Sequence, residues 1–190
     1  MNKTIILSSL LVLFFNPIFS QNKEEQVVKH HEVKTNAFNL IVFKSIDFSY
    51  EYLIDSESSA GVSLLFNLQD FDNDFYNDGP IYNEKFAFTT YYRRFFSSKH
   101  AWGFFLEAFG MYNIQESLDG YYNYNIDEYF YSDEKSNNVA FGISIGGKFV
   151  SKKGFLFEFF GGAGRNIYSS NEYIATEIVP RVGVTLGYRF

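Results

Sequence analysis

Charged side chains recur inside segments that are otherwise apolar or rich in glycine. The residues of this kind are Asp47, Glu51, Lys85, Arg93, Glu107, Lys148, Glu158, Arg181 and Arg189. Each stands among the polar positions of an alternating segment, so we predict that they all point into one interior. Acids and bases are nearly balanced, and a buried charge is costly unless it is paired. The expected chemistry is a structural network of ion pairs; the alternative is a small gated ion path through the same charges.

Acidic residues and tyrosines interleave in longer polar stretches at 69–84 and 116–137. The residues singled out here are Asp70, Asp72, Asp74, Tyr121, Tyr122, Tyr124, Tyr129 and Tyr131. Aromatic side chains supply contact area at low entropic cost, so these stretches are predicted to form an extracellular interaction surface. The alternative is a solvated, repulsive rim that limits aggregation. The acid spacing invites calcium, but Phe75 stands where an EF-hand loop requires glycine, and no metal site is predicted.

Histidine is poorly placed for catalysis. His30 and His31 precede the alternating segments, and His100 falls in a short turn. Gly142-Ile143-Ser144-Ile145-Gly146 matches GxSxG, but it lies inside the alternating segment 138–150 and not at a strand-to-helix turn, so it is no nucleophile elbow. The adjacent acids Asp127 and Glu128 are of the kind that is usually solvated in loops. We therefore predict no catalytic residue and no cofactor.

Alternating segments must position the charges, and eight can be distinguished. They are 35–43, 46–54, 59–68, 85–96, 101–115, 138–150, 155–168 and 178–190. The last places Ile178, Val182 and Leu186 on one face and Arg181 and Arg189 on the other. A period of two indicates a strand with two different faces. Most segments reach the roughly 9–11 residues that a tilted strand needs to cross a bilayer.

The connections alternate in length. Those at 55–58, 97–100 and 151–154 are short, those at 69–84, 116–137 and 169–177 are longer, and the link near Lys44 is a short exception. Short periplasmic turns and longer outward loops are the rule in outer-membrane barrels. This parity places both ends of the barrel in the periplasm.

Composition agrees with a membrane location. Aromatic residues make up 21% of the 190 residues, which suits a lipid-facing band with aromatic girdles. The absence of cysteine excludes disulfides and thiol chemistry, and the net charge of -6 argues against nucleic acid. Residues 1–20 are predicted to be a signal peptide rather than a membrane anchor, 21–33 a periplasmic lead-in, and 34–190 the barrel.

A secreted lipocalin-like barrel also has eight strands, but its apolar face is inside. Three features favour the opposite orientation here. The polar face is rich in Gly, Ala and Ser, as a narrow interior demands. Aromatic residues gather at the periplasmic ends of the segments, and the chain ends on Phe190.

A signal ending in Phe19-Ser20-Gln21, eight alternating segments and a C-terminal Gly-Tyr-Arg-Phe together resemble the small OmpA/OmpX-type outer-membrane barrels, most of all those common in Bacteroidota. The likeness extends over 34–190 and is one of pattern. It implies contact with outer-membrane lipid and assembly by the barrel assembly machinery through the C-terminal strand.

The sequence thus predicts an all-β protein, an eight-stranded antiparallel transmembrane up-and-down β-barrel, with a non-enzymatic role. That role is structural or adhesive, or that of an accessory subunit, with a protein partner in the outer membrane or at the cell surface. A small transport or ligand-binding barrel is the main alternative, and an enzyme that modifies outer-membrane lipid is the third.

Overall fold

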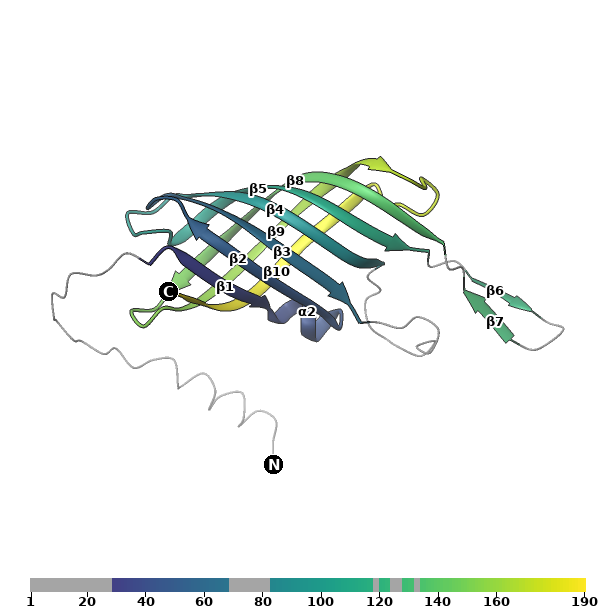
Figure 1. The fold of residues 1–190 in the computed structure, drawn as a ribbon, viewed down its shortest axis with the longest axis horizontal. Helices are drawn as coiled ribbons and strands as arrows, with labels where there is room; N and C mark the ends of the chain where they lie inside the picture. Colours follow the sequence, from purple (N-terminus) through teal and green to yellow (C-terminus); the bar gives the residue numbers. More distant parts are fainter. Residues whose placement is uncertain (1–28, 69–82, 118–119, 124–127, 132–133) are drawn as a thin grey trace, which may run out of the picture.

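Eight antiparallel strands form a closed barrel (Figure 1). The computed structural model describes residues 29–68, 83–117, 120–123, 128–131 and 134–190. The barrel strands are β1 (His31–Asn36), β2 (Ser45–Leu53), β3 (Ser58–Asn67), β4 (Glu84–Phe95), β5 (Gly103–Glu116), β8 (Lys135–Val150), β9 (Phe155–Ser169) and β10 (Ile178–Arg189). Each pairs with its neighbours, and β1 closes the barrel against β10. The predicted fold class is confirmed.

The apolar face of the barrel points outward. Phe48, Phe141, Ile143 and Phe155 are 59%, 58%, 63% and 65% exposed, whereas Asp47 and Ser144, which adjoin Phe48 and Ile143 in the chain, are buried. A water-soluble protein seldom exposes so large an apolar surface, and a band of this kind is what a bilayer covers. The lipocalin-like alternative, with its apolar face inside, is therefore wrong.

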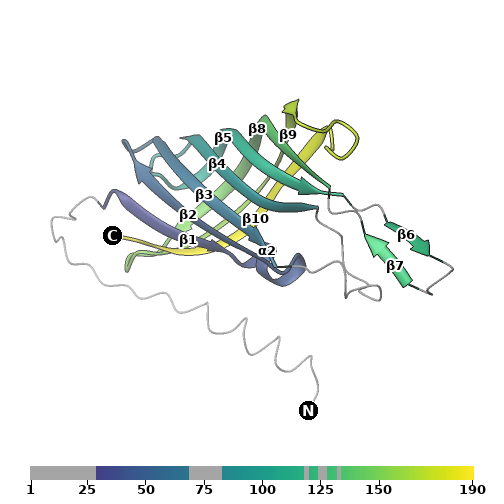
Figure 2. The same ribbon diagram turned by 45° about the vertical axis from the view of Figure 1, so that its right-hand side comes forward.

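The two ends of the barrel differ. The start of β1 and the C-terminus lie together, joined by hydrogen bonds between His31 and Phe190 in both directions; we call this the terminus end. Its connections are 54–57, 96–102 and 151–154. At the opposite end, which we call the loop end, lie helix α2 (Ala37–Val42) and a separate hairpin of β6 (Gly120–Asn123) and β7 (Glu128–Tyr131) (Figures 1 and 2).

Aromatic rings gather at the terminus end, where a membrane–water interface is expected to hold them. Trp102 contacts Phe149 with ring centroids 5.4 Å apart, and Phe155 contacts Tyr188 at 5.5 Å. On the same side, outward-facing Arg94 pairs with Glu57, each about half exposed. The charge of Arg94 is thus placed where it can reach water.

The first predicted strand is wrong over much of its length. A strand was expected at 35–43, but β1 spans His31–Asn36 and the chain then forms α2, so the link to β2 is not the short exception expected near Lys44. Strand β1 also begins inside the predicted lead-in, at His31. Because α2 is shorter than two helical turns, it leaves no readable helical period in the sequence.

Asn36 explains where β1 can end. Its side chain donates to Val182 O at 3.1 Å and accepts from Val184 N at 3.2 Å, so one amide continues the ladder along β10. Its Oδ1 also accepts from Asn39 N at 3.3 Å and caps α2. Beyond this point β10 has no β1 partner. Alternate residues of a strand direct their N–H groups to the same side, so the N–H that Pro180 lacks would face the side of β1, where β10 has no partner at this level. Pro180 therefore removes no hydrogen bond from the ladder.

Glycines on the inner face make room for aromatic rings. A Cβ added at Gly61 would lie 2.4 Å from the Tyr91 ring, and one at Gly142 would lie 2.5 Å from Phe109. A barrel of eight strands has an interior only wide enough for side chains to fill. The alternation of glycine with large rings is therefore a packing requirement.

Among the described residues, no helix is both long and apolar enough to span a membrane.

Candidate functional site: a charge cluster across the lumen

Charged side chains fill the lumen from the terminus end to beyond its middle. We call them the lumen charge cluster. Its members are Glu32, Lys34, Glu51, Arg93, Glu107, Lys148, Glu158, Arg181 and Arg189. All are buried, and each forms at least one ion pair within the cluster. They come from seven of the eight barrel strands, all but β3, and each occupies an inward position of its strand.

The layer nearest the terminus end is centred on Glu32. Lys148 Nζ donates to Glu32 Oε2 at 2.8 Å, and Arg189 Nε donates to Oε1 at 2.7 Å. The terminal nitrogens of Arg189 donate to the carbonyls of His100 at 3.0 Å and Ala101 at 2.7 Å. This layer ties β1, β8 and β10 to the connection between β4 and β5.

Glu51 is the hub of the next layer and is 0% exposed. Lys148 Nζ donates to its Oε1 at 2.5 Å, and Arg93 donates to its Oε2 at 2.8 Å. The ammonium of Lys34 contacts the same carboxylate, and the hydroxyl of Ser59 donates to it at 2.6 Å. Three bases and a hydroxyl therefore satisfy one acid, which offsets the cost of burying it.

Arg93 joins three acids. Besides Glu51, it donates through Nε to Glu107 at 2.7 Å and through a terminal nitrogen to Glu158 at 2.8 Å. Its guanidinium also lies 4.5 Å from the Tyr91 ring centroid and 4.4 Å from that of Phe105. Arginine suits this place because its planar fork can serve several carboxylates while its faces stack on rings.

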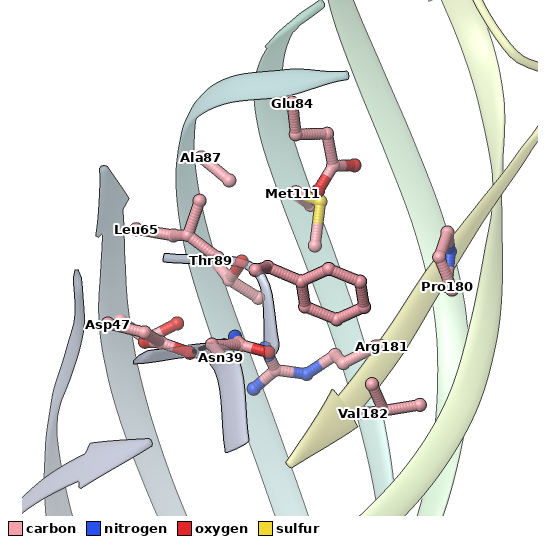
Figure 3. Close-up of a pocket in the computed structure, with 12 residues that line it drawn as sticks. Asn39, Asp47, Leu65, Glu84, Ala87, Thr89, Met111, Pro180, Arg181 and Val182 are labelled. Atoms are coloured by element: carbon pink, nitrogen blue, oxygen red, sulfur yellow. Dashed lines mark hydrogen bonds between the residues drawn. The ribbon is translucent and has the colours of Figure 1, made fainter. Parts of the chain in front are cut away.

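Arg181 closes the cluster toward the loop end. Its Nε donates to Glu107 Oε1 at 2.7 Å, and Ser144 donates to the same oxygen at 2.6 Å. Beyond it, Asp47 accepts from Asn39 at 3.0 Å and from Asn36 at 3.2 Å. Asp47, Asn39 and Arg181 line a cavity of about 60 Å³ (Figure 3).

Uncharged polar groups continue the filling at the loop end. Asn138 donates to Asn113 at 2.9 Å and accepts from Ser136 at 2.7 Å. Gln115 exchanges hydrogen bonds with Thr176 from the connection before β10, both at 2.9 Å. The lumen is thus occupied by bonded side chains over most of its length.

Most residues that the sequence assigned to the interior lie there. Asp47, Glu51, Arg93, Glu107, Lys148, Glu158, Arg181 and Arg189 are all buried. Lys85 differs, because its side chain is 40% exposed and its ammonium lies 3.5 Å from Glu116 at the loop end. A register shift between Glu84 and Phe86 takes Lys85 out of the inward row.

Glu32 and Lys34 are members that the sequence reasoning missed. The prediction of a lead-in over 21–33 excludes Glu32 from the barrel, and the weak alternation around 35–43 gives no reason to assign Lys34 to the interior. The signal was present in the alternation of Glu32, Lys34 and Asn36 with Val33, which is outward and 47% exposed. Three polar inward positions in so short a strand do not stand out without the partner charges.

The other predicted chemistry lies elsewhere or outside the described residues. Asp70, Asp72, Asp74 and Tyr124 are not described, and for Tyr121, Tyr122, Tyr129 and Tyr131 only the backbone pairing of β6 with β7 is known. Within the described part of the chain, no group of three or more His, Cys, Asp or Glu residues could hold a metal ion.

All three histidines lie at the terminus end. His30 Nδ1 is 2.8 Å from the carbonyl of Leu53, and His31 Nδ1 is 2.6 Å from the Tyr50 hydroxyl. The His100 ring lies 5.9 Å from that of His30. Burial, with the nearby Arg189 guanidinium adding to it, lowers the pKa of His100. These contacts anchor the N-terminal segment against the barrel.

The closed barrel, its outward apolar band and its charged interior together define an eight-stranded transmembrane β-barrel. No family model and no curated protein matches the chain. Among solved structures it is similar to the outer membrane protein Ail of Yersinia pestis, whose backbone structure was determined in a phospholipid bilayer nanodisc. The two are 12% identical, the match covers 86% of this chain and 100% of that one, and the TM-score is 0.40.

Proposed function

We propose that this protein is a non-conducting, non-enzymatic barrel of the bacterial outer membrane, with its loop end facing the outside. The observation that carries the proposal is the lumen charge cluster. It spans the interior through ion pairs that join opposite walls, such as Lys148 of β8 to Glu51 of β2 and Arg93 of β4 to Glu158 of β9. A lumen closed in this way stiffens the barrel and leaves contact with lipid or a partner to the outer surface and the loops.

The two alternative functions, a transport barrel and an enzyme at the rim, fit the interior less well. A transport barrel needs a continuous aqueous path, and the cavities next to Asp47 and Glu158 are not lined by Glu32, Lys148 or Arg189 of the layer beyond them. Histidine is the most frequent general base of enzymes, and the chain's three histidines, His30, His31 and His100, lie at the terminus end rather than at the loop end. We therefore favour a structural or interaction role, including that of an accessory subunit of an outer-membrane complex.

Several parts of the proposal rest on the sequence. We propose that residues 1–20 are removed during export, that the barrel assembly machinery recognises β10, and that the acidic loops meet a protein partner at the cell surface. The chain would then stand with the small OmpA/OmpX-type barrels of the kind common in Bacteroidota. Purification in mild detergent followed by mass measurement separates a lone barrel from a subunit of a larger complex.

Labelling on intact cells tests location and orientation together. Glu172→Cys places a thiol at the loop end, and Lys152→Cys places one in the exposed turn at the terminus end; the unmodified chain has no cysteine. A membrane-impermeant maleimide should label the first variant on intact cells and the second only after the outer membrane is permeabilised. The reverse pattern, or labelling of neither variant before permeabilisation, contradicts the proposed orientation or location.

A further inference from the structure

Two oxygen atoms deep in the lumen have no hydrogen-bond partner among the described residues. They are Glu158 Oε1 and Thr185 Oγ1, on side chains that are 0% and 4% exposed. The other carboxylate oxygen of Glu158 accepts from Arg93 and Lys34. An unsatisfied buried oxygen costs about 1–3 kcal/mol, and more when it is charged. Two of them in one place call for a ligand that satisfies both.

The two residues face one another. Glu158 of β9 and Thr185 of β10 are directly paired in the sheet register, and both point inward. Both residues line the same small cavity of about 10 Å³, together with the polar residues Ser49 and Ser63. A cavity of roughly 10–15 Å³ holds one water molecule when two to four polar partners surround it. The site has the size and the donors and acceptors for one water.

A larger cavity adjoins this site on the side of the loop end. The cavity of about 60 Å³ shares Asp47, Ser63 and Arg181 with the smaller one. Its other walls include Asn39 of α2 and Pro180 near the start of β10, both at the loop end (Figure 3). By the same volume per molecule, it has room for several waters.

The side toward the terminus end is closed. Phe160, which lines the smaller cavity, packs in a buried apolar cluster with Leu53, Phe95, Ala101 and Phe105. The charged groups at this level are bonded to one another, and the apolar cluster offers water no hydrogen-bond partner. Access to Glu158 is therefore one-sided.

We propose that the lumen holds a dead-end, water-filled vestibule that is entered from the loop end and ends at a water molecule bridging Glu158 Oε1 and Thr185 Oγ1. The ligand of this vestibule is water. The proposal is independent of the location and partners of the barrel, because it depends only on the interior.

Single cysteines make the vestibule measurable with silver ions, since the unmodified chain has no cysteine. Thr185→Cys probes the innermost site, and Ser63→Cys probes the wall between the two cavities. Ser59→Cys and Ser144→Cys are matched controls, because both serines are buried (0% and 1% exposed) and line neither cavity. Each variant is folded in lipid vesicles and exposed to Ag⁺; thiols that remain are then counted with a maleimide after unfolding.

We expect Thr185→Cys and Ser63→Cys to react at least tenfold faster than the two controls. Equal rates at Thr185→Cys and Ser59→Cys would overturn the proposal, because they would mean either a sealed lumen or a path open throughout. If Thr185→Cys does not fold, water-edited solid-state NMR of the unmodified protein in bilayers gives the same test. Rapid magnetisation transfer from water to Thr185, with slow transfer to Ser59, supports the vestibule, and slow transfer to both overturns it.

Discussion

Replacing Arg93 with methionine is the sharpest test of the lumen charge cluster as a stabilising network. The substitution keeps an unbranched apolar stem against Tyr91 and Phe105 but removes a guanidinium that contacts three acids, at 2.7 Å from Glu107 and 2.8 Å from both Glu51 and Glu158. Removing one partner of a buried ion pair costs about 3–5 kcal/mol, because it leaves the other charge uncompensated.

Other bases limit the loss. Lys34 and Lys148 still contact Glu51, Arg181 still holds Glu107, and Lys34 lies 3.3 Å from Glu158. We therefore expect a loss of about 4 kcal/mol, near the middle of the range for one buried partner, rather than the sum over three contacts. That corresponds to about a thousand-fold in the folding equilibrium.

The matched control is the next residue in the chain. Arg94→Met removes a guanidinium of the same kind from the outward face, where Arg94 and Glu57 are each 49% exposed. An exposed pair contributes about 0–1 kcal/mol. The free energy of unfolding of both variants is measured by urea titration in lipid vesicles. The folded fraction at each urea concentration is read on a gel from samples that are not heated, in which folded and unfolded barrels migrate differently. A loss below about 1 kcal/mol for Arg93→Met, or equal losses for the two variants, would refute the network as a source of stability.

Three further outcomes can be checked with the same unfolding assay. Asn36→Ala should cost about 2–4 kcal/mol, since it removes two bonds to β10 and a helix cap; a loss under 0.5 kcal/mol would contradict the role given to this amide. Gly162→Ala should cost about 1–3 kcal/mol because its Cβ would lie 2.2 Å from Ile143 O, whereas Gly161→Ala, with nothing within 4 Å, should cost much less; equal losses would rule out crowding as the reason. Burial lowers the pKa of His100 below its ordinary value of 6.5. As the pH falls below 6.5, His100 therefore takes up a proton in the unfolded chain before it does so in the folded barrel, and the stability that neutral His100 contributes is lost. His100→Gln should flatten this part of the urea-midpoint profile, and an unchanged slope would show that other groups cause it.

The strands and their faces could be predicted because successive side chains of a strand point to opposite faces. In a transmembrane barrel one of these faces meets lipid and the other meets the interior, so apolar and polar residues alternate. Positions such as Phe157 and Glu158 differ so strongly that the alternation assigns inside and outside once one face is known to meet lipid. Neither residue alone shows which face meets lipid. The small residues of the polar face indicate that this face lines the narrow interior, and the outward position of Phe157, which is 42% exposed, agrees with that assignment.

The partners within the cluster could not be predicted, because register decides them. Lys34 and Glu51 meet only because β1 and β2 pair with Glu32 opposite Glu51, and the sequence did not show that β1 begins at His31. A similar limit applies to Lys85, where a one-residue irregularity in the pairing moves a side chain from the inward row to the rim. Alternation gives the face of a residue, and only the register gives its neighbours.

The short helix α2 was missed for a different reason. Its sequence, Ala37 to Val42, has a single polar residue, Asn39, between the apolar Phe38 and Leu40, and this weak alternation passes for part of a strand. The deciding interaction is the side chain of Asn36, which pairs with β10 and caps the helix at once. Such tertiary bonds override a local pattern of only six residues.

Conductance in a planar lipid bilayer tests the closed lumen most directly. The purified, unmodified barrel, inserted at low protein density in 1 M KCl, should give no stable unitary current steps, because the layer of Glu32, Lys148 and Arg189 and the cluster around Phe105 close the path below Glu158. The barrel is delivered to the planar bilayer from lipid vesicles, and its folding in these vesicles is verified separately by the gel shift between unheated and heated samples. Stable unitary steps from that material would contradict the account.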